Sequence, residues 1–104
     1  MSNFLRNVFG KSPDLRSIHL RGATIIDVRS RMEFRNGHIQ GAVNIPLDTL
    51  AAEIDALKEK GKPIIACCRS GARSGAAVSL LGQSGLEAYN GGAWSSLERI
   101  IRPE

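Results

Sequence analysis

The feature that most constrains the fold is a strand-like run at residues 23–29, whose middle is wholly apolar. A strand without polar residues in its middle is covered on both faces, which is typical of a parallel sheet with helices on either side. A second apolar run, at residues 62–66, is bounded by proline and has the same character. Shorter strands are predicted at residues 42–45 and 86–90. The sequence therefore predicts an α/β fold.

Helical periodicity and helix-ending residues fill the segments between these strands. The predicted helices lie at residues 13–21, 30–35, 47–60, 75–82 and 93–101. The first has Ser12 as its expected N-cap and ends at Gly22, and Gly91 with Gly92 forms a predicted turn before the last. Residues 1–10 space their apolar side chains as one face of a helix. We interpret this segment as a helix packed onto the domain, with a partner-binding or membrane-surface helix as the alternative.

A cysteine lies where a predicted strand ends and a predicted helix begins. The stretch is Cys68-Arg69-Ser70-Gly71-Ala72-Arg73-Ser74. The first turn of a helix has unpaired backbone N–H groups and the positive end of the helix dipole, so it attracts anions. Gly71, between two small residues, allows the loop to curl until several N–H groups converge. We interpret the loop as an anion-binding site around Cys68; the alternative is a small apolar residue at a strand end.

The same loop predicts an ionised thiol. Thiolates at helix N-termini or beside arginine have pKa values of roughly 3.5–7.5, against about 8.5 for a free thiol. Arg69 and Arg73 lie close to Cys68 in the sequence, so we expect Cys68 to be substantially ionised at neutral pH. Cys68 is therefore the candidate nucleophile. Its neighbour Cys67 is expected to be the last strand residue, with its side chain toward the opposite face, and to act in packing rather than as a resolving thiol.

Two charged residues that follow the first strand are expected to support this loop. The carboxyl ends of parallel strands face the ligand crevice in α/β sheets, so Asp27 and Arg29 are predicted to lie near Cys68. Glu33, in the short helix that follows, is a candidate partner for Arg29 or Arg31.

One histidine and two aromatic residues have two interpretations each. His38 is a candidate general base, but a structural hydrogen bond within the turn at residues 37–41 is favoured. Tyr89 and Trp94 are candidates for lining a substrate pocket, but large aromatic residues at strand or helix spacing are more often part of the core.

Length and composition limit the class of protein. The 104 residues predict a single domain covering residues 1–104, with residues 1–12 as a helix-like N-terminal extension. With 42% hydrophobic and 23% charged residues the chain has an ordinary globular composition, and no apolar run approaches the roughly 18–20 residues of a membrane span. The N-terminus lacks the features of a secretion signal, so a cytoplasmic protein is expected.

The cysteines, histidines and net charge argue against several further classes. Neighbouring strand residues point to opposite faces, so Cys67 and Cys68 are not expected to form a structural disulfide. His19 and His38 have no zinc-like spacing with them, and neither a metal nor a cofactor is predicted. The net charge of +4 comes from arginines scattered along the chain. We therefore expect small anions, and not nucleic acid, as partners.

Four sequence segments together resemble the rhodanese family of single-domain sulfurtransferases. They are residues 26–29 with 33–34, residues 37–46, residues 68–74 and residues 90–94, and they occur in the family order. The resemblance implies a doubly wound α/β fold with a mainly parallel central sheet flanked by helices on both faces. The chain departs from the family at its N-terminus, where the family usually opens with a short strand.

The resemblance also implies a reaction and a site. Cys68 would take a sulfur atom from an anionic donor such as thiosulfate, hold it as a persulfide, and pass it to cyanide or a thiol acceptor. Asp27 and Arg29 would support the loop. The residues that would cradle the persulfide and the leaving anion are Arg69, Ser70, Gly71, Ala72, Arg73 and Ser74.

Two other functions stay open at the level of sequence. A persulfide carrier for a dedicated protein donor or acceptor would have the same site as a free-standing enzyme. Cysteine-dependent phosphatases and some arsenate reductases also place a cysteine and an arginine between a strand and a helix. In the related phosphatases five residues separate the two, whereas here only residues 69–72 lie between Cys68 and Arg73. The shorter loop favours a sulfur atom over a phosphoryl group.

Overall fold

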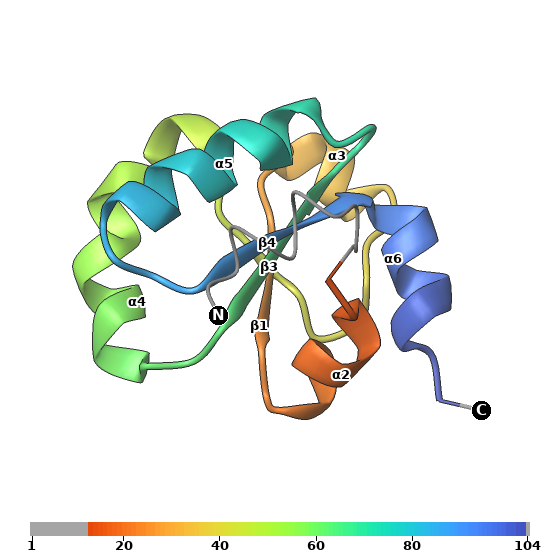
Figure 1. Cartoon of the computed structure of the whole chain (residues 1–104). Helices are drawn as coiled ribbons and strands as arrows, with labels where there is room; N and C mark the ends of the chain where they lie inside the picture. The colour runs from red at the N-terminus through yellow and green to blue at the C-terminus, as the bar shows by residue number, and fades with distance from the viewer. Residues whose placement is uncertain (1–12, 104) are drawn as a thin grey trace.

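The computed structural model describes residues 13–103, and these contain one sheet of parallel strands. The strands are β1 (Thr24–Asp27), β2 (Val43–Asn44), β3 (Ile64–Cys68) and β4 (Ala88–Ala93), in the order β2-β1-β3-β4. The helices are α2 (Leu15–Leu20), α3 (Arg31–Arg35), the 3-10 helix η1 (Leu47–Glu53), α4 (Ile54–Lys60), α5 (Ala72–Gln83) and α6 (Trp94–Ile101). The predicted α/β fold is confirmed, with helices on both faces of a parallel sheet (Figure 1).

Helices cover both faces because successive residues of the central strands point to opposite sides of the sheet. In β1, Ile25 packs in the cluster that contains residues of α2 and α6, and Ile26 packs in the cluster that contains residues of α4 and α5. Figure 1 shows these two pairs of helices on opposite sides of the strands. All five residues of β3 are buried. Cys67 and Cys68 belong to different clusters, so these adjacent thiols face opposite sides of the sheet.

Several helix boundaries differ from the predictions, and α5 begins at Ala72, three residues before the predicted start at residue 75. The N-cap of α2 is Asp14, whose side chain accepts a hydrogen bond from the Ser17 N–H at 3.1 Å; the predicted cap, Ser12, lies outside the described residues, as does the predicted helix at residues 1–10. The single helix predicted at residues 47–60 is split into η1 and α4. Leu47 and Leu50 are three residues apart, which also suits the three-residue turn of a 3-10 helix.

Gly91 and Gly92 do not form the predicted turn but lie within β4, where they make a bulge. Both stand opposite the single residue Cys67 of β3, which shifts the register of the strand pair. A Cβ at Gly91 would lie 2.9 Å from side-chain atoms of Ile65 and Leu97, so only glycine fits there. Gly92 has φ +75°, a conformation that favours glycine. The bulge brings β4 into register for the start of α6.

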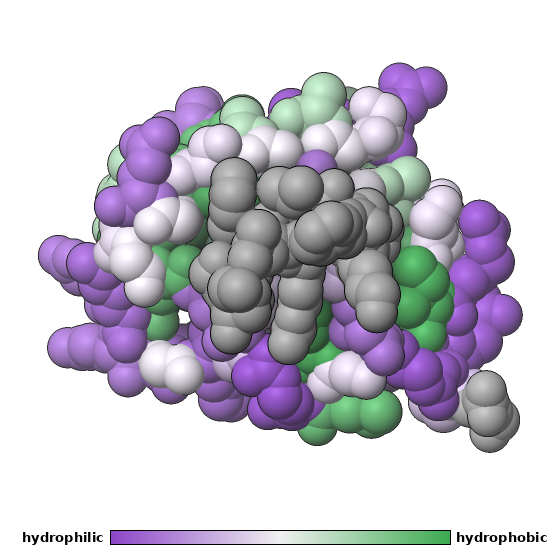
Figure 2. Space-filling model, in the orientation of Figure 1, coloured by the Kyte–Doolittle hydropathy of each residue, from purple (hydrophilic) through white to green (hydrophobic). Residues whose placement is uncertain are grey.

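The surface formed by residues 13–103 carries few large apolar side chains. On the face seen in Figure 2, hydrophilic side chains predominate and hydrophobic ones occupy small separate areas. Among the described residues, the large apolar side chains that are exposed are those of Leu20, Met32, Val43 and Ile100. Scattered exposure of this kind is normal and does not by itself mark a binding site. None of the helices formed by residues 13–103 is long and apolar enough to cross a membrane.

Candidate functional site

The candidate site is built at the junction of β3 and α5, as the sequence predicts. Cys68 is the last residue of β3, one residue beyond the strand end predicted at Cys67. Gly71 is the N-cap of α5 and has φ +107°, in the left-handed region that favours glycine. The connection from strand to helix therefore takes only three residues, and it turns the first backbone N–H groups of α5 back toward the Cys68 thiol.

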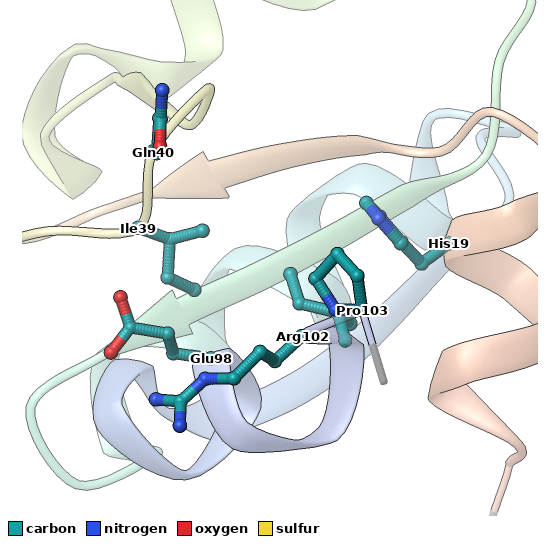
Figure 3. A pocket seen from close by; sticks show the side chains of 7 residues that line it. His19, Ile39, Gln40, Glu98, Arg102 and Pro103 are labelled. Carbon is teal, nitrogen blue, oxygen red and sulfur yellow. The ribbon is translucent and has the colours of Figure 1, made fainter.

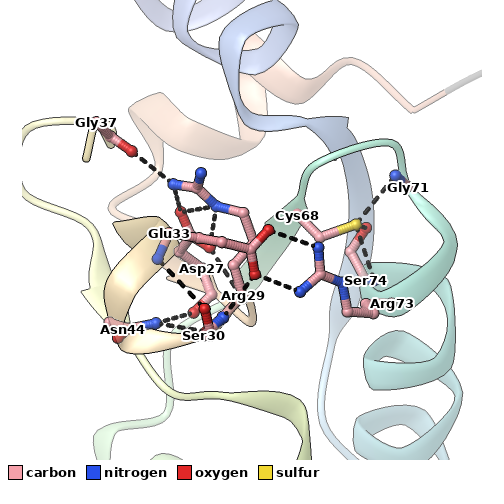
Figure 4. Close-up of polar contacts among 10 residues, drawn as sticks. All are labelled: Asp27, Arg29, Ser30, Glu33, Gly37, Asn44, Cys68, Gly71, Arg73 and Ser74. Atoms are coloured by element: carbon pink, nitrogen blue, oxygen red, sulfur yellow. Dashed lines mark hydrogen bonds and ion pairs between the residues drawn. The ribbon is translucent and has the colours of Figure 1, made fainter. Parts of the chain in front are cut away.

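The Cys68 sulfur accepts hydrogen bonds from this loop (Figure 4). The backbone N–H groups of Gly71 and Ser74 lie 3.0 and 3.4 Å from Sγ. The Ser74 hydroxyl lies 3.3 Å from Sγ. Burial alone would raise the pKa of the Cys68 thiol, but the hydrogen bonds from Ser74 and from backbone N–H groups of the loop outweigh it and lower the pKa below the ordinary value. The sequence analysis expected the neighbouring arginines to stabilise the Cys68 thiolate, whereas in the structure the stabilisation comes mainly from hydrogen bonds.

The guanidinium of Arg73 is held by Glu33 of α3. Two hydrogen bonds, of 2.7 and 3.0 Å, join Arg73 to the two carboxylate oxygens. Glu33 also completes a capping box with Ser30 at the start of α3. The prediction that Glu33 pairs with Arg29 or Arg31 is therefore wrong, because its carboxylate is oriented by the helix cap toward α5. The hydrogen bonds from Arg73, and then from Ser30, lower the pKa of Glu33 to about 2.

The pKa of Glu33 predicts a measurable pH dependence of stability. Because its pKa in the folded state, about 2, lies below the ordinary value of 4.5, Glu33 stabilises the protein above pH 4.5 and loses this effect as the pH falls toward about 2. We expect Glu33→Gln to show a shallower fall of the urea unfolding midpoint over this pH range than the wild type. Glu59→Gln, which removes an exposed carboxylate from α4, is the matched control and should keep the wild-type slope. Parallel curves for Glu33→Gln and the wild type would contradict the prediction.

Asp27 and Arg29 form a buried ion pair at the end of β1. Their side chains are 0% and 6% exposed, and Arg29 Nη2 lies 2.7 Å from Asp27 Oδ2. Arg29 also donates to the carbonyl of Gly37 at 2.7 Å and lies over the Trp94 ring, 4.9 Å from its centroid. The hydrogen bond to Asp27 raises the pKa of Arg29.

The contacts of this pair hold the polypeptide on both sides of α3. The Asn44 side chain adds hydrogen bonds of 3.0 Å to the backbone carbonyls of both Asp27 and Arg29. Asp27 is in register with Cys67, so the pair lies beside the strand that carries Cys68, and among residues 13–103 neither side chain hydrogen-bonds to loop residues 69–74 (Figure 4).

The remaining loop residues form the outer part of the site. Arg69, Ser70 and Ala72 are exposed. Arg69 makes no hydrogen bond or ion pair with any residue in the described part of the chain, which leaves its charge available to an anion at the mouth of the loop. Cys67, in contrast, is completely buried on the other face of the sheet, and burial raises the pKa of its thiol to about 12.

The favoured interpretations of the histidine and aromatic residues agree with the structure, except that the hydrogen bond of His38 joins the turn to α3 and does not lie within the turn. The Nδ1 atom of His38 lies 2.6 Å from the carbonyl of Phe34, and the two rings stack with centroids 3.7 Å apart. Tyr89 and Trp94 are partly buried and pack against the cluster on the α2 and α6 face.

The sequence analysis missed Asn90, which bonds directly to the loop. Its side-chain amide contacts both Gly71 and Ser74. An asparagine directly before two glycines is a local signal for a side chain that bonds to the backbone two residues ahead, and that bond, to the Gly92 N–H, is present at 2.9 Å.

A pocket of about 380 Å³ lies apart from this loop (Figure 3). It is lined by residues of α2, of the turn after α3 and of the end of α6, including His19, Glu98 and Arg102. The Nδ1 atom of His19 is buried and has no hydrogen-bond partner among residues 13–103. Because no residue of the Cys68 loop lines this pocket, it is not part of the candidate site.

Comparison with known proteins gives consistent matches. A family model described as rhodanese-like domain matches residues 14–95. The chain is 42% identical over 71 residues to the uncharacterized protein YqhL of Bacillus subtilis (strain 168), a match that covers 67% of this chain and 56% of that protein. It is 36% identical over 61 residues to the thiosulfate sulfurtransferase PspE of Escherichia coli (strain K12), covering 58% of this chain and 59% of that protein. The chain thus spans less than two thirds of the length of these curated relatives.

Among solved structures, the human single-domain sulfurtransferase TSTD1 is similar with a TM-score of 0.66 and 32% sequence identity. That match covers 88% of this chain and 94% of the human one. The similarity therefore extends over the sheet and the helices on both of its faces.

Proposed function

Because the chain belongs to the rhodanese-like domain family, a family of sulfurtransferases, we propose that it transfers sulfane sulfur through a persulfide on Cys68. The observation that supports this most directly is the position of the Cys68 sulfur, which accepts backbone hydrogen bonds from Gly71 and Ser74 at the start of α5. Such a sulfur is stabilised as an anion, and a thiolate is the form that attacks another sulfur atom.

The first half of the proposed reaction loads the cysteine. The Cys68 thiolate attacks the outer sulfur of thiosulfate, a new S–S bond forms, and the S–S bond of thiosulfate breaks so that sulfite leaves with its electron pair. The Cys68 persulfide keeps one negative charge, which the N–H groups of the loop stabilise. Arg69, exposed at the rim, attracts the doubly charged donor.

The second half regenerates the thiolate. Cyanide or the thiolate of an acceptor attacks the outer sulfur of the persulfide, and the thiocyanate or new persulfide leaves while Cys68 returns to its original charge. No proton or electron has to be supplied from elsewhere. The reaction suits a reducing compartment such as the cytoplasm, because Cys67 and Cys68 are both free thiols.

The contacts of Arg73 argue against phosphoryl transfer at this loop. A phosphoryl group needs an arginine that is free to clamp its oxygens, whereas the Arg73 guanidinium is already paired with Glu33 at 2.7 Å. The short connection between Cys68 and α5 also leaves a small cradle.

The proposed function is tested by measuring the intact mass of the reduced protein before and after incubation with thiosulfate. We expect a gain of one sulfur atom, which cyanide removes with release of thiocyanate. Uptake of sulfur only from a protein persulfide donor would identify a carrier instead of a free-standing thiosulfate enzyme. No uptake from either donor, with hydrolysis of an aryl phosphate or reduction of arsenate in its place, would refute sulfur transfer.

A further inference from the structure

One side chain outside the loop contacts both of the residues that donate backbone N–H groups to the Cys68 sulfur. Asn90 of β4 donates from Nδ2 to the carbonyl of Gly71 at 3.1 Å and accepts at Oδ1 from the Ser74 hydroxyl at 2.7 Å. Gly71 and Ser74 are also the residues whose N–H groups lie 3.0 and 3.4 Å from Sγ. The Asn90 amide thus contacts both Gly71 and Ser74, the two residues whose N–H groups donate to Sγ.

The orientation of the Asn90 amide is itself fixed. The N–H of Gly92, within the bulge of β4, donates to Oδ1 at 2.9 Å, so the oxygen and nitrogen of the amide have separate partners and cannot exchange places without loss of hydrogen bonds. Gly75, in the first turn of α5, leaves room for this amide: a Cβ at that position would lie 3.3 Å from Nδ2. The bulge of β4 therefore fixes the orientation of the Asn90 amide, and the glycine in the first turn of α5 leaves space for it.

We propose that Asn90 is a positioning residue for Cys68, which holds the N–H groups of Gly71 and Ser74 on the sulfur through their carbonyl and hydroxyl groups. Asn90 does not touch the sulfur. Without it, the Gly71 carbonyl keeps only its hydrogen bond from the Gly75 N–H, the Ser74 side chain loses its anchor on β4, and the two N–H groups shift away from Sγ. The thiolate then loses stabilisation, and the Ser74 hydroxyl, released from Oδ1, offsets part of this loss by donating its one proton to Sγ.

Two other titratable groups interact electrostatically with the thiol, Cys67 on β3 and Arg73 on α5. The further charged groups near this end of the sheet are Asp27 and Arg29 at the end of β1, Glu33 on α3 and Arg69 in the loop. None of them changes when Asn90 is replaced by a neutral residue. A change in the pKa of Cys68 in such a variant would therefore report on the positions of the donors and not on a change of charge.

The test measures the rate of alkylation of Cys68 by iodoacetamide as a function of pH in Asn90→Leu. We expect the apparent pKa of Cys68 to rise by about one unit, so that alkylation at a pH below the pKa is about tenfold slower, with an unchanged limiting rate at high pH. In a Ser74→Ala background, where no hydroxyl can donate to Sγ, Asn90→Leu should raise the pKa at least as much, because the contact with the Gly71 carbonyl does not involve the hydroxyl. An unchanged or lower pKa in that comparison would overturn the proposal.

Controls separate this role from a general effect on folding. Ser84→Ala removes a hydrogen bond of 3.1 Å at the opposite end of α5 and should leave the pKa of Cys68 at its wild-type value. If Asn90→Leu does not fold, the smaller neutral substitution Asn90→Ala, which also removes the amide and adds no charge, should raise the pKa as well. The proposal rests on the proposed function for its biological meaning, but alkylation needs no sulfur donor. A wild type that takes no sulfur from thiosulfate or from a protein persulfide donor would refute the proposed function and leave this test intact.

Discussion

Replacing Cys68 with serine abolishes sulfur transfer, with an expected loss of at least about a thousandfold. The loop lowers the pKa of a thiol, but a serine hydroxyl in its place stays protonated at neutral pH and is a poor nucleophile toward sulfur. The Cys68 side chain is small and the exchange keeps its size, so the fold should persist. The check is the rate of thiocyanate formation from thiosulfate and cyanide, together with circular dichroism of the variant.

Cys67→Ala is the matched control for this experiment. Cys67 is adjacent in the sequence, but it lies on the other face of the sheet, in an apolar cluster, with a thiol whose pKa burial raises to about 12. We expect its replacement to leave most of the sulfur transfer in place. Full activity in Cys68→Ser, or a comparable loss in both variants, would refute the assignment of Cys68 as the sulfur acceptor.

Replacing Asp27 with alanine should be the most destabilising change among the charged residues. It leaves Arg29, whose side chain is only 6% exposed, with a buried charge and without the carboxylate that accepts its hydrogen bonds. Breaking a buried ion pair from one side typically costs about 3–5 kcal/mol, which is a large share of the roughly 5–15 kcal/mol that stabilises a domain. The free energy of unfolding in urea measures this loss.

The exposed pair of Arg21 and Glu87 provides the comparison. Their side chains are 54% and 45% exposed, so Arg21→Ala should change the free energy of unfolding by about 1 kcal/mol or less. An equal effect of Asp27→Ala and Arg21→Ala would show that burial of the first pair contributes nothing to stability.

The elements that the sequence predicts well are those whose side chains are fixed by local pattern. The strands around Ile25 and Ile65 are apolar at consecutive positions, and only a sheet covered on both faces accommodates that pattern. The predicted turn at Gly91 and Gly92 is wrong because the local pattern fits two structures. The pair Gly91 and Gly92 suits a turn as well as a bulge, and only the tight packing against Ile65 and Leu97 decides between them.

The candidate site likewise has a part that the sequence predicts and a part that it does not. The order of strand, cysteine, glycine-containing loop and helix predicts a site at Cys68, because each part is adjacent to the next in the chain. The partners of the loop come from elsewhere: Glu33 is 40 residues before Arg73, and Asn90 is 16 residues after Ser74. Neither contact follows from helical or strand periodicity. Local spacing favoured a neighbour for Glu33, whereas the capping box at Ser30 turns its carboxylate toward α5.

The opposite orientation of Cys67 and Cys68 has a consequence for the lifetime of the proposed persulfide. If the two thiols faced one another, the second could attack the inner sulfur of the persulfide, form a disulfide with the first and release the outer sulfur as sulfide, in a first-order reaction. With the strand backbone between them, that route is closed. We therefore expect a loaded molecule to keep its sulfur until a second molecule collides with it, with a discharge rate proportional to the acceptor concentration.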